Sequence, residues 1–95
     1  MTIKYRTKDG QADYEFSFEQ QPRGDWRAYI VSQPSYGSRV ANADRSHRLT
    51  DSSTGRKYVC WSEPVRSRDD LKKVVAVWSD RTQRYIKYGT PIDRP

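Results

Sequence analysis

Five basic residues and one tyrosine gather between positions 36 and 57, where carboxylates are few. Arginine presents paired N–H donors that fit phosphate and carboxylate groups, and tyrosine presents a rigid ring against which a base or a partner side chain can stack. The same mixture occurs in nucleic-acid grooves and in the hot spots of protein interfaces. The candidate binding residues are Tyr36, Arg39, Arg45, Arg48, Arg56 and Lys57.

The net charge of the chain is +6, and it is distributed unevenly. Residues 1–19 carry a net charge of −1, residues 20–59 carry +4 and residues 60–95 carry +3. A basic balance of this kind favours nucleic acid, an anionic surface or an acidic protein as the partner. We therefore expect a small non-catalytic binding module that engages nucleic acid through residues 36–57.

Two other interpretations of residues 36–57 stay open. The chain could instead be a protein-interaction or inhibitor module whose arginines and tyrosine meet an acidic protein surface. The stretch could also be a solvated loop without a partner. The choice between DNA, RNA and protein, the sequence specificity and the oligomeric state are not set by the sequence.

The pairing of residue types that suggests catalysis is His47 with Cys60, because a thiolate can act as a nucleophile beside a histidine base. No third residue that would orient the histidine is evident, and free cysteine is commonly a buried, inert side chain. The TGRK stretch at residues 54–57 lacks the spacing of a phosphate-binding loop. We therefore expect no catalytic residues and no enzymatic activity.

The single cysteine excludes an internal disulfide, and the single histidine leaves too few ligands for a structural zinc site. No run approaches the roughly 18 apolar residues of a membrane helix, and the first residues lack the apolar core of a signal peptide. We therefore expect a cytoplasmic protein without a metal, a small-molecule cofactor or a membrane association. The Arg-Gly-Asp sequence at residues 23–25 is interpreted as a turn.

Residues 2–18 predict a β-hairpin, because apolar and basic residues alternate before Asp9-Gly10, a pair that favours a two-residue type I′ turn. One face of this hairpin is ionic and the other is apolar. Since its basic residues face carboxylates, they are poor candidates for phosphate binding. The predicted cross-strand pairs are Arg6 with Asp13, Lys4 with Glu15, Tyr5 with Tyr14 and Ile3 with Phe16.

Three further elements follow along the chain. A strand is predicted at residues 26–31, after the turn formers Pro22 and Gly24, and a second hairpin is predicted at residues 47–61. Residues 33–46 between them show no apolar periodicity. A connection of about 14 residues without periodicity is usually a functional or a mobile loop.

A long helix is predicted from Arg68 to the stop at Gly89, with Ser67 as its N-cap. Its apolar stripe repeats with the period of an α-helix. We therefore expect one α+β domain over residues 1–95, in which an antiparallel sheet of about five strands packs against one long C-terminal helix. The sheet combines two hairpins and a central strand, in an order that the sequence leaves open. The stripe consists of Leu71, Val74, Val75, Trp78, Thr82, Tyr85 and Ile86, and it should meet Tyr14, Phe16 and Phe18 of the sheet.

Overall fold

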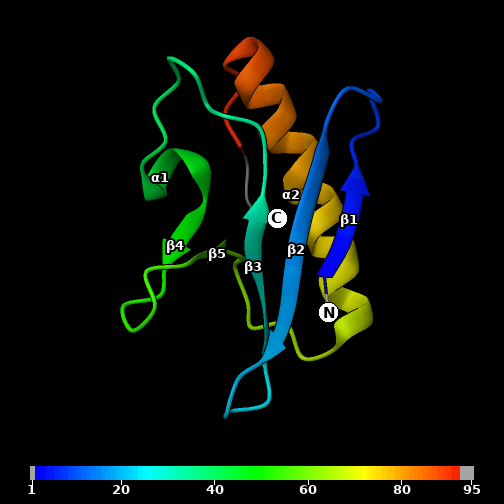
Figure 1. Cartoon of the computed structure of the whole chain (residues 1–95), viewed down its shortest axis with the longest axis vertical. Coiled ribbons are helices and arrows are strands. Elements are labelled where there is room, and N and C mark those ends of the chain that lie inside the picture. The colour runs from blue at the N-terminus through cyan, green and yellow to red at the C-terminus, as the bar shows by residue number, and fades with distance from the viewer. Residues whose placement is uncertain (1, 93–95) are drawn as a thin grey trace.

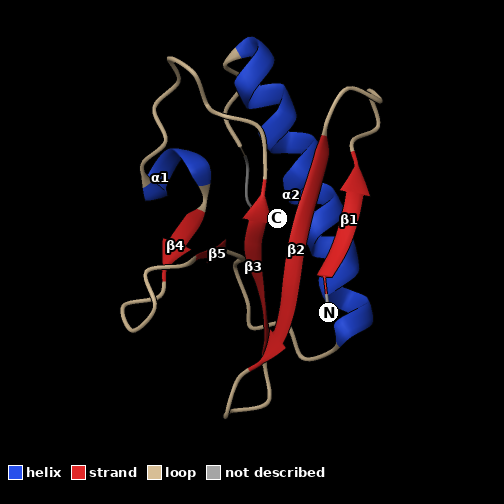
Figure 2. Cartoon of the chain, in the orientation of Figure 1, coloured by secondary structure: helices blue, strands red, loops and turns tan. Residues whose placement is uncertain are grey.

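A five-stranded antiparallel sheet in the order β1-β2-β3-β5-β4 packs one face against a long helix, as Figure 1 shows. The computed structural model describes residues 2–92. Figure 2 shows the sheet in front of α2 with no helix over its near face. This α+β arrangement confirms the predicted fold class. The elements are β1 (Thr2–Arg6), β2 (Asp13–Gln20), β3 (Trp26–Ser32), α1 (Ala43–Ser46), β4 (Arg48–Thr50), β5 (Lys57–Val59) and α2 (Arg68–Tyr88).

The predicted β1–β2 register is confirmed at all four cross-strand pairs, but the predicted turn is wrong. Gly10 has a positive φ of 71°, whereas Asp9 does not have the positive φ that a type I′ turn needs. The amide of Gly10 instead bonds to the carbonyl of Thr7, and the amide of Thr7 bonds to Ala12. The Asp9 carboxylate favours this wider turn because it accepts hydrogen bonds from the Thr7 hydroxyl and the Gln11 amide. These bonds, with the Thr7 hydroxyl as the largest cause, lower the pKa of Asp9 to about 2.

Arg6 and Asp13 form an exposed ion pair of 3.1 Å across the hairpin, and this pair allows a direct test of the register. We expect a double-mutant cycle of Arg6→Ala and Asp13→Ala to give a coupling of about 0.2–1 kcal/mol in urea unfolding. Neither substitution should change the nucleic-acid binding that the sequence predicts for residues 36–57. A zero coupling, combined with a large loss of binding in Arg6→Ala, would contradict both the register and the exclusion of this hairpin from the binding surface.

The helix α2 forms as predicted because both of its ends are capped. The Ser67 hydroxyl accepts a hydrogen bond from the Asp70 amide, and Gly89 adopts a left-handed φ of 74° that closes the last turn. Its stripe is buried from Leu71 to Tyr85, with Ile86 half-buried. Within residues 2–92, no helix combines the length and the apolar character needed to cross a membrane.

Trp78 lies at the centre of the core between α2 and the sheet. Its ring meets the rings of Tyr14 and Phe16 at centroid distances of 5.9 and 6.0 Å, in the edge-on geometry that aromatic pairs favour. Its indole Nε1 donates to the carbonyl oxygen of Ser46 at 3.1 Å. The aromatic core that the sequence predicted is therefore present, and Phe18 also belongs to it.

The pairing between β3 and β5 has the fewest Cα pairs of the strand pairings in the described sheet. The two strands share one Cα pair, Tyr29 with Tyr58, whereas all three residues of β5 pair with β4. Beyond it the chain leaves β5 and touches β3 again at the bridge between Trp26 and Val65. Between these two contacts the chain departs from β3, over residues 60–64, which belong to no helix or strand.

Candidate functional site

Tyr36 anchors the 33–46 loop and is not the exposed stacking surface that the sequence suggested. Its side chain is 8% exposed and packs with Tyr85 and Ile92 in a small second apolar cluster. Burial raises the pKa of its hydroxyl group, which lies near Gln33 and Thr82 without a hydrogen bond of good geometry to either side chain. In this conformation the ring supports the loop and leaves no face for a ligand.

Two of the candidate arginines hold the same loop in place. Arg48 lies over the Tyr36 ring, with its Cζ atom 4.8 Å from the ring centre, and it donates to the Gln33 side chain and the Ala41 carbonyl. Arg39 donates to two carbonyl oxygens in the last turn of α2, at 3.3 and 3.4 Å. A cation at this end of a helix is favourable because the last carbonyl groups have no partner within the helix.

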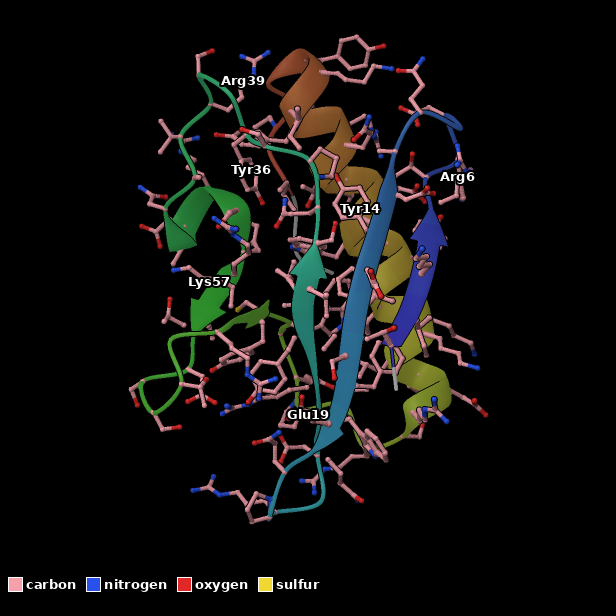
Figure 3. The ribbon with its side chains drawn as sticks, in the orientation of Figure 1. Arg6, Tyr14, Glu19, Tyr36, Arg39 and Lys57 are labelled. Atoms are coloured by element: carbon pink, nitrogen blue, oxygen red, sulfur yellow. The ribbon has the colours of Figure 1, made fainter. Side chains whose placement is uncertain are left out.

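The short helix α1, which the sequence did not predict, completes the anchoring of this loop. Its first turn is capped by the Asn42 side chain, which accepts a hydrogen bond from the Arg45 amide at 3.0 Å. The hydroxyl of Ser46 returns to the Asn42 carbonyl at 2.8 Å. Figure 3 shows Tyr36 between this loop and α2, with Arg39 farther out along the loop.

Arg56 belongs to an ion and ring network on the sheet face that α2 does not cover. It pairs with both carboxylate oxygens of Glu19, at 2.7 and 3.0 Å, while its Cζ atom lies 3.8 Å from the Tyr29 ring centre. Arg27 lies over the neighbouring Tyr58 ring in the same way, at 4.2 Å. Since its charge is already neutralised, Arg56 offers less to a phosphate than the sequence suggested.

Asp51 closes this network from the turn between β4 and β5. It accepts hydrogen bonds from the Ser53 hydroxyl at 2.7 Å and the Tyr29 hydroxyl at 2.8 Å, and it lies 3.5 Å from Arg27. These contacts, with that of Ser53 as the largest cause, hold the pKa of Asp51 well below its usual range. On the sheet face that α2 does not cover, Arg56 is therefore compensated by Glu19 and Arg27 by Asp51.

Arg45 and Lys57 remain as the candidate cations whose charge faces solvent. Both side chains are exposed, and neither forms an ion pair within residues 2–92. Lys57 donates to the neutral Thr50 hydroxyl across the β4–β5 hairpin. The structure thus divides the predicted set into Tyr36, Arg39 and Arg48, which support the loop, Arg56, which is ion-paired, and the solvent-facing Arg45 and Lys57.

His47 and Cys60 are neighbours across the second hairpin, as the sequence placed them, and the Cys60 amide donates to the His47 carbonyl at 2.8 Å. His47 has a left-handed φ of 52° that ends α1. Its buried Nδ1 atom makes no hydrogen bond within the described part of the chain. No group there orients the imidazole as a catalytic base would require.

Two adjoining hollows, which the sequence reasoning missed, lie where β3 and β5 diverge. The aromatic hollow measures about 240 Å³ and is lined in part by Trp26, Tyr58, Trp61, Val65, Leu71 and Val74. The arginine hollow measures about 460 Å³ and is lined in part by Pro22, Arg23, Asp25, Arg27, Pro64 and Arg66. Asp25, Arg27 and Pro64 line both hollows, which are therefore adjacent.

No protein family, no curated protein and no solved structure matches this chain. Among residues 2–92, no three His, Cys, Asp or Glu side chains come together in a group that could hold a metal ion. The described surface offers guanidinium and ammonium groups for anions, and indole rings at the edge of a hollow for planar groups. Both features are suited to binding.

Proposed function

We propose that the protein is a non-catalytic module that binds nucleic acid through the loop and hairpin at residues 36–57. Arg45 and Lys57 are the principal phosphate contacts. Arg39 adds to the positive field from the outer part of the loop. The observation that carries this proposal is that these exposed cations belong to a segment anchored on the body of the protein.

The anchoring has a direct energetic consequence for binding. A mobile loop would lose conformational freedom when it meets a ligand, and that loss would subtract from the affinity. Here the buried Tyr36 ring, the Arg39 contacts with α2 and the Asn42 cap already order the loop. The cations are therefore positioned before a polyanion arrives.

The paired arginines lower the expected number of phosphate contacts. Arg48 and Arg56 are engaged within the protein, which leaves two or three of the five predicted cations for phosphate. Each neutralised phosphate contributes about −0.9 to the slope of log affinity against log salt for duplex DNA. We therefore expect a slope of roughly −1.8 to −2.7.

A charge-matched pair of variants tests this proposal. Replacing Arg45 and Lys57 together by alanine should flatten the salt slope by up to about 1.8, as measured by fluorescence anisotropy with labelled duplex DNA, single-stranded DNA and RNA. The control replaces Lys4 and Arg6, which removes the same charge from the opposite edge of the sheet and should leave the slope nearly unchanged.

Two results would refute the proposal. One is an equal loss of binding in both double variants, because net charge would then suffice to explain the affinity. The other is the absence of binding to duplex, single strand and RNA below about micromolar concentration at low salt.

A protein partner is the second candidate, and the apolar side chains near the cations favour it. Val31, Val40 and Leu49 are 53%, 55% and 39% exposed. Apolar groups mixed with arginine are typical of protein interfaces. An acidic partner should co-purify with the protein at a salt concentration that abolishes DNA binding, whereas a nucleic-acid module should retain no defined protein under those conditions.

A further inference from the structure

Three arginine residues from separate parts of the chain line the arginine hollow. Arg23 comes from the turn after β2, Arg27 from β3 and Arg66 from the segment before α2. Figure 1 shows the turn between β2 and β3 at the lower end of the sheet, and the bridge from Trp26 to Val65 brings the segment before α2 beside it. Asp25 is the carboxylate among the lining residues, so the formal charge of the lining is positive.

The three arginines differ in how they are held. Arg27 is oriented by Asp51 at 3.5 Å and by the Tyr58 ring. Arg23 and Arg66 are exposed and form no ion pair within residues 2–92. A guanidinium presents N–H groups in a planar fork that matches two oxygens of a phosphate. The hollow can therefore accept a compact anion with the exposed Arg23 and Arg66, beside Arg27, whose charge Asp51 already compensates.

The adjoining aromatic hollow complements this site with apolar surface. Trp26 and Trp61 are partly buried against the core, while Leu71 and Val74 of α2 belong to the lining. Indole rings bind planar heteroaromatic groups by stacking, which is favourable with any base. The arginine hollow, at about 460 Å³, falls within the range of about 300–1,000 Å³ that is typical of small-molecule sites, and the aromatic hollow lies beside it.

We propose that the two hollows bind a nucleoside monophosphate unit, with its base in the aromatic hollow and its phosphate at Arg23 and Arg66. The two hollows are adjacent and share Arg27 and Pro64 in their linings, which supports this ligand because a nucleotide joins a planar ring to an anion through a short sugar. The unit is either a free nucleotide or the phosphorylated end of a strand. The site shares no residue with the phosphate contacts proposed at residues 36–57.

The test uses the full chain and adenosine 5′-monophosphate as the probe. In a ¹H–¹⁵N NMR titration, the indole N–H signals of Trp26 and Trp61 should shift, while that of Trp78 should not, because Trp78 is buried and its N–H is bonded to Ser46. Adenosine without phosphate should bind at least about tenfold more weakly, because it makes no charge-assisted hydrogen bonds with the arginines.

Two double variants separate this site from the surface at residues 36–57. Replacing Arg23 and Arg66 by glutamine should weaken binding of the monophosphate by at least about tenfold, with unchanged thermal unfolding because both side chains are exposed. Replacing Arg45 and Lys57 by alanine removes the same charge and should leave this binding unchanged. Each of the two proposals can therefore fail in these measurements while the other one holds.

Three results would overturn the inference. They are the absence of shifts at Trp26 and Trp61 up to about 10 mM probe, unchanged affinity in the Arg23 and Arg66 variant, and inorganic phosphate binding as tightly as the nucleotide. A short 5′-phosphorylated oligonucleotide distinguishes a free nucleotide from the phosphorylated end of a strand as the ligand. In the Arg45 and Lys57 double variant, which lacks the contacts proposed at residues 36–57, tighter binding than the mononucleotide assigns the site to the end of a strand, and weaker binding assigns it to a free nucleotide.

Discussion

Replacing Trp78 by alanine is expected to lower the free energy of unfolding by about 3–5 kcal/mol. The side chain is 1% exposed, and its removal leaves a cavity between α2 and the rings of Tyr14 and Phe16. It also leaves the Ser46 carbonyl without its indole donor. Since domains of this kind have a total stability of about 5–15 kcal/mol, much of the population should unfold. Urea denaturation followed by circular dichroism measures the effect.

Val77 provides the matched control for this substitution. It lies next to Trp78 on the same helix but is 37% exposed, so Val77→Ala should cost less than about 1 kcal/mol. If Trp78→Ala instead unfolds at the same urea concentration as the parent, the indole does not lie in the core. The face that α2 turns toward the sheet would then have to be reassigned.

Replacing Tyr36 by alanine should have the second largest effect, a loss of about 2–4 kcal/mol. The ring is the apolar anchor that the loop places against Tyr85 and Ile92, and Arg48 covers it from the other side. Without the ring the 33–46 loop should separate from α2. The same variant should then bind nucleic acid more weakly, because Arg45 is no longer held in position.

The phenylalanine variant at position 36 distinguishes the ring from its hydroxyl group. Tyr36→Phe keeps the packing and removes a buried oxygen that makes no good hydrogen bond within the described residues. Removal of such a group should change the stability by less than about 0.5 kcal/mol or increase it slightly. A loss as large as that of Tyr36→Ala would show that the hydroxyl group, through contacts different from those described, anchors the loop.

The elements whose conformation is set by residues close to one another in the sequence were predictable from the sequence. The β1–β2 register follows from alternation over a few residues, so it is correct even though the turn geometry at Asp9 is not. The helix from Arg68 to Tyr88 follows from its cap residues and its periodic stripe. The strand order β1-β2-β3-β5-β4 depends on tertiary packing, for which single-sequence patterns carry no signal.

The site was less predictable because its decisive contacts join distant positions. Arg56 meets a carboxylate 37 residues earlier, at Glu19, and the sum of charges in a local window does not reveal this pair. Tyrosine combines an apolar ring with a polar hydroxyl, so its pattern alone does not show that Tyr36 is buried. The hollows lie between the turn after β2 and residues 61–66, segments that only the folded chain brings together.

Because a single Cα pair joins β3 to β5, we expect the two sides of the sheet to differ in their protection from hydrogen exchange. Strand β2 is paired on both sides and carries Tyr14 and Phe16 into the core, so its amide protons should exchange with solvent only when the whole domain unfolds. Strand β4 is paired on one side over three residues, and its amides should exchange through a smaller, local opening. Because the hairpin of β4 and β5 supplies both Lys57 and one wall of the aromatic hollow, the expected local opening of this hairpin would involve both surfaces proposed for ligands.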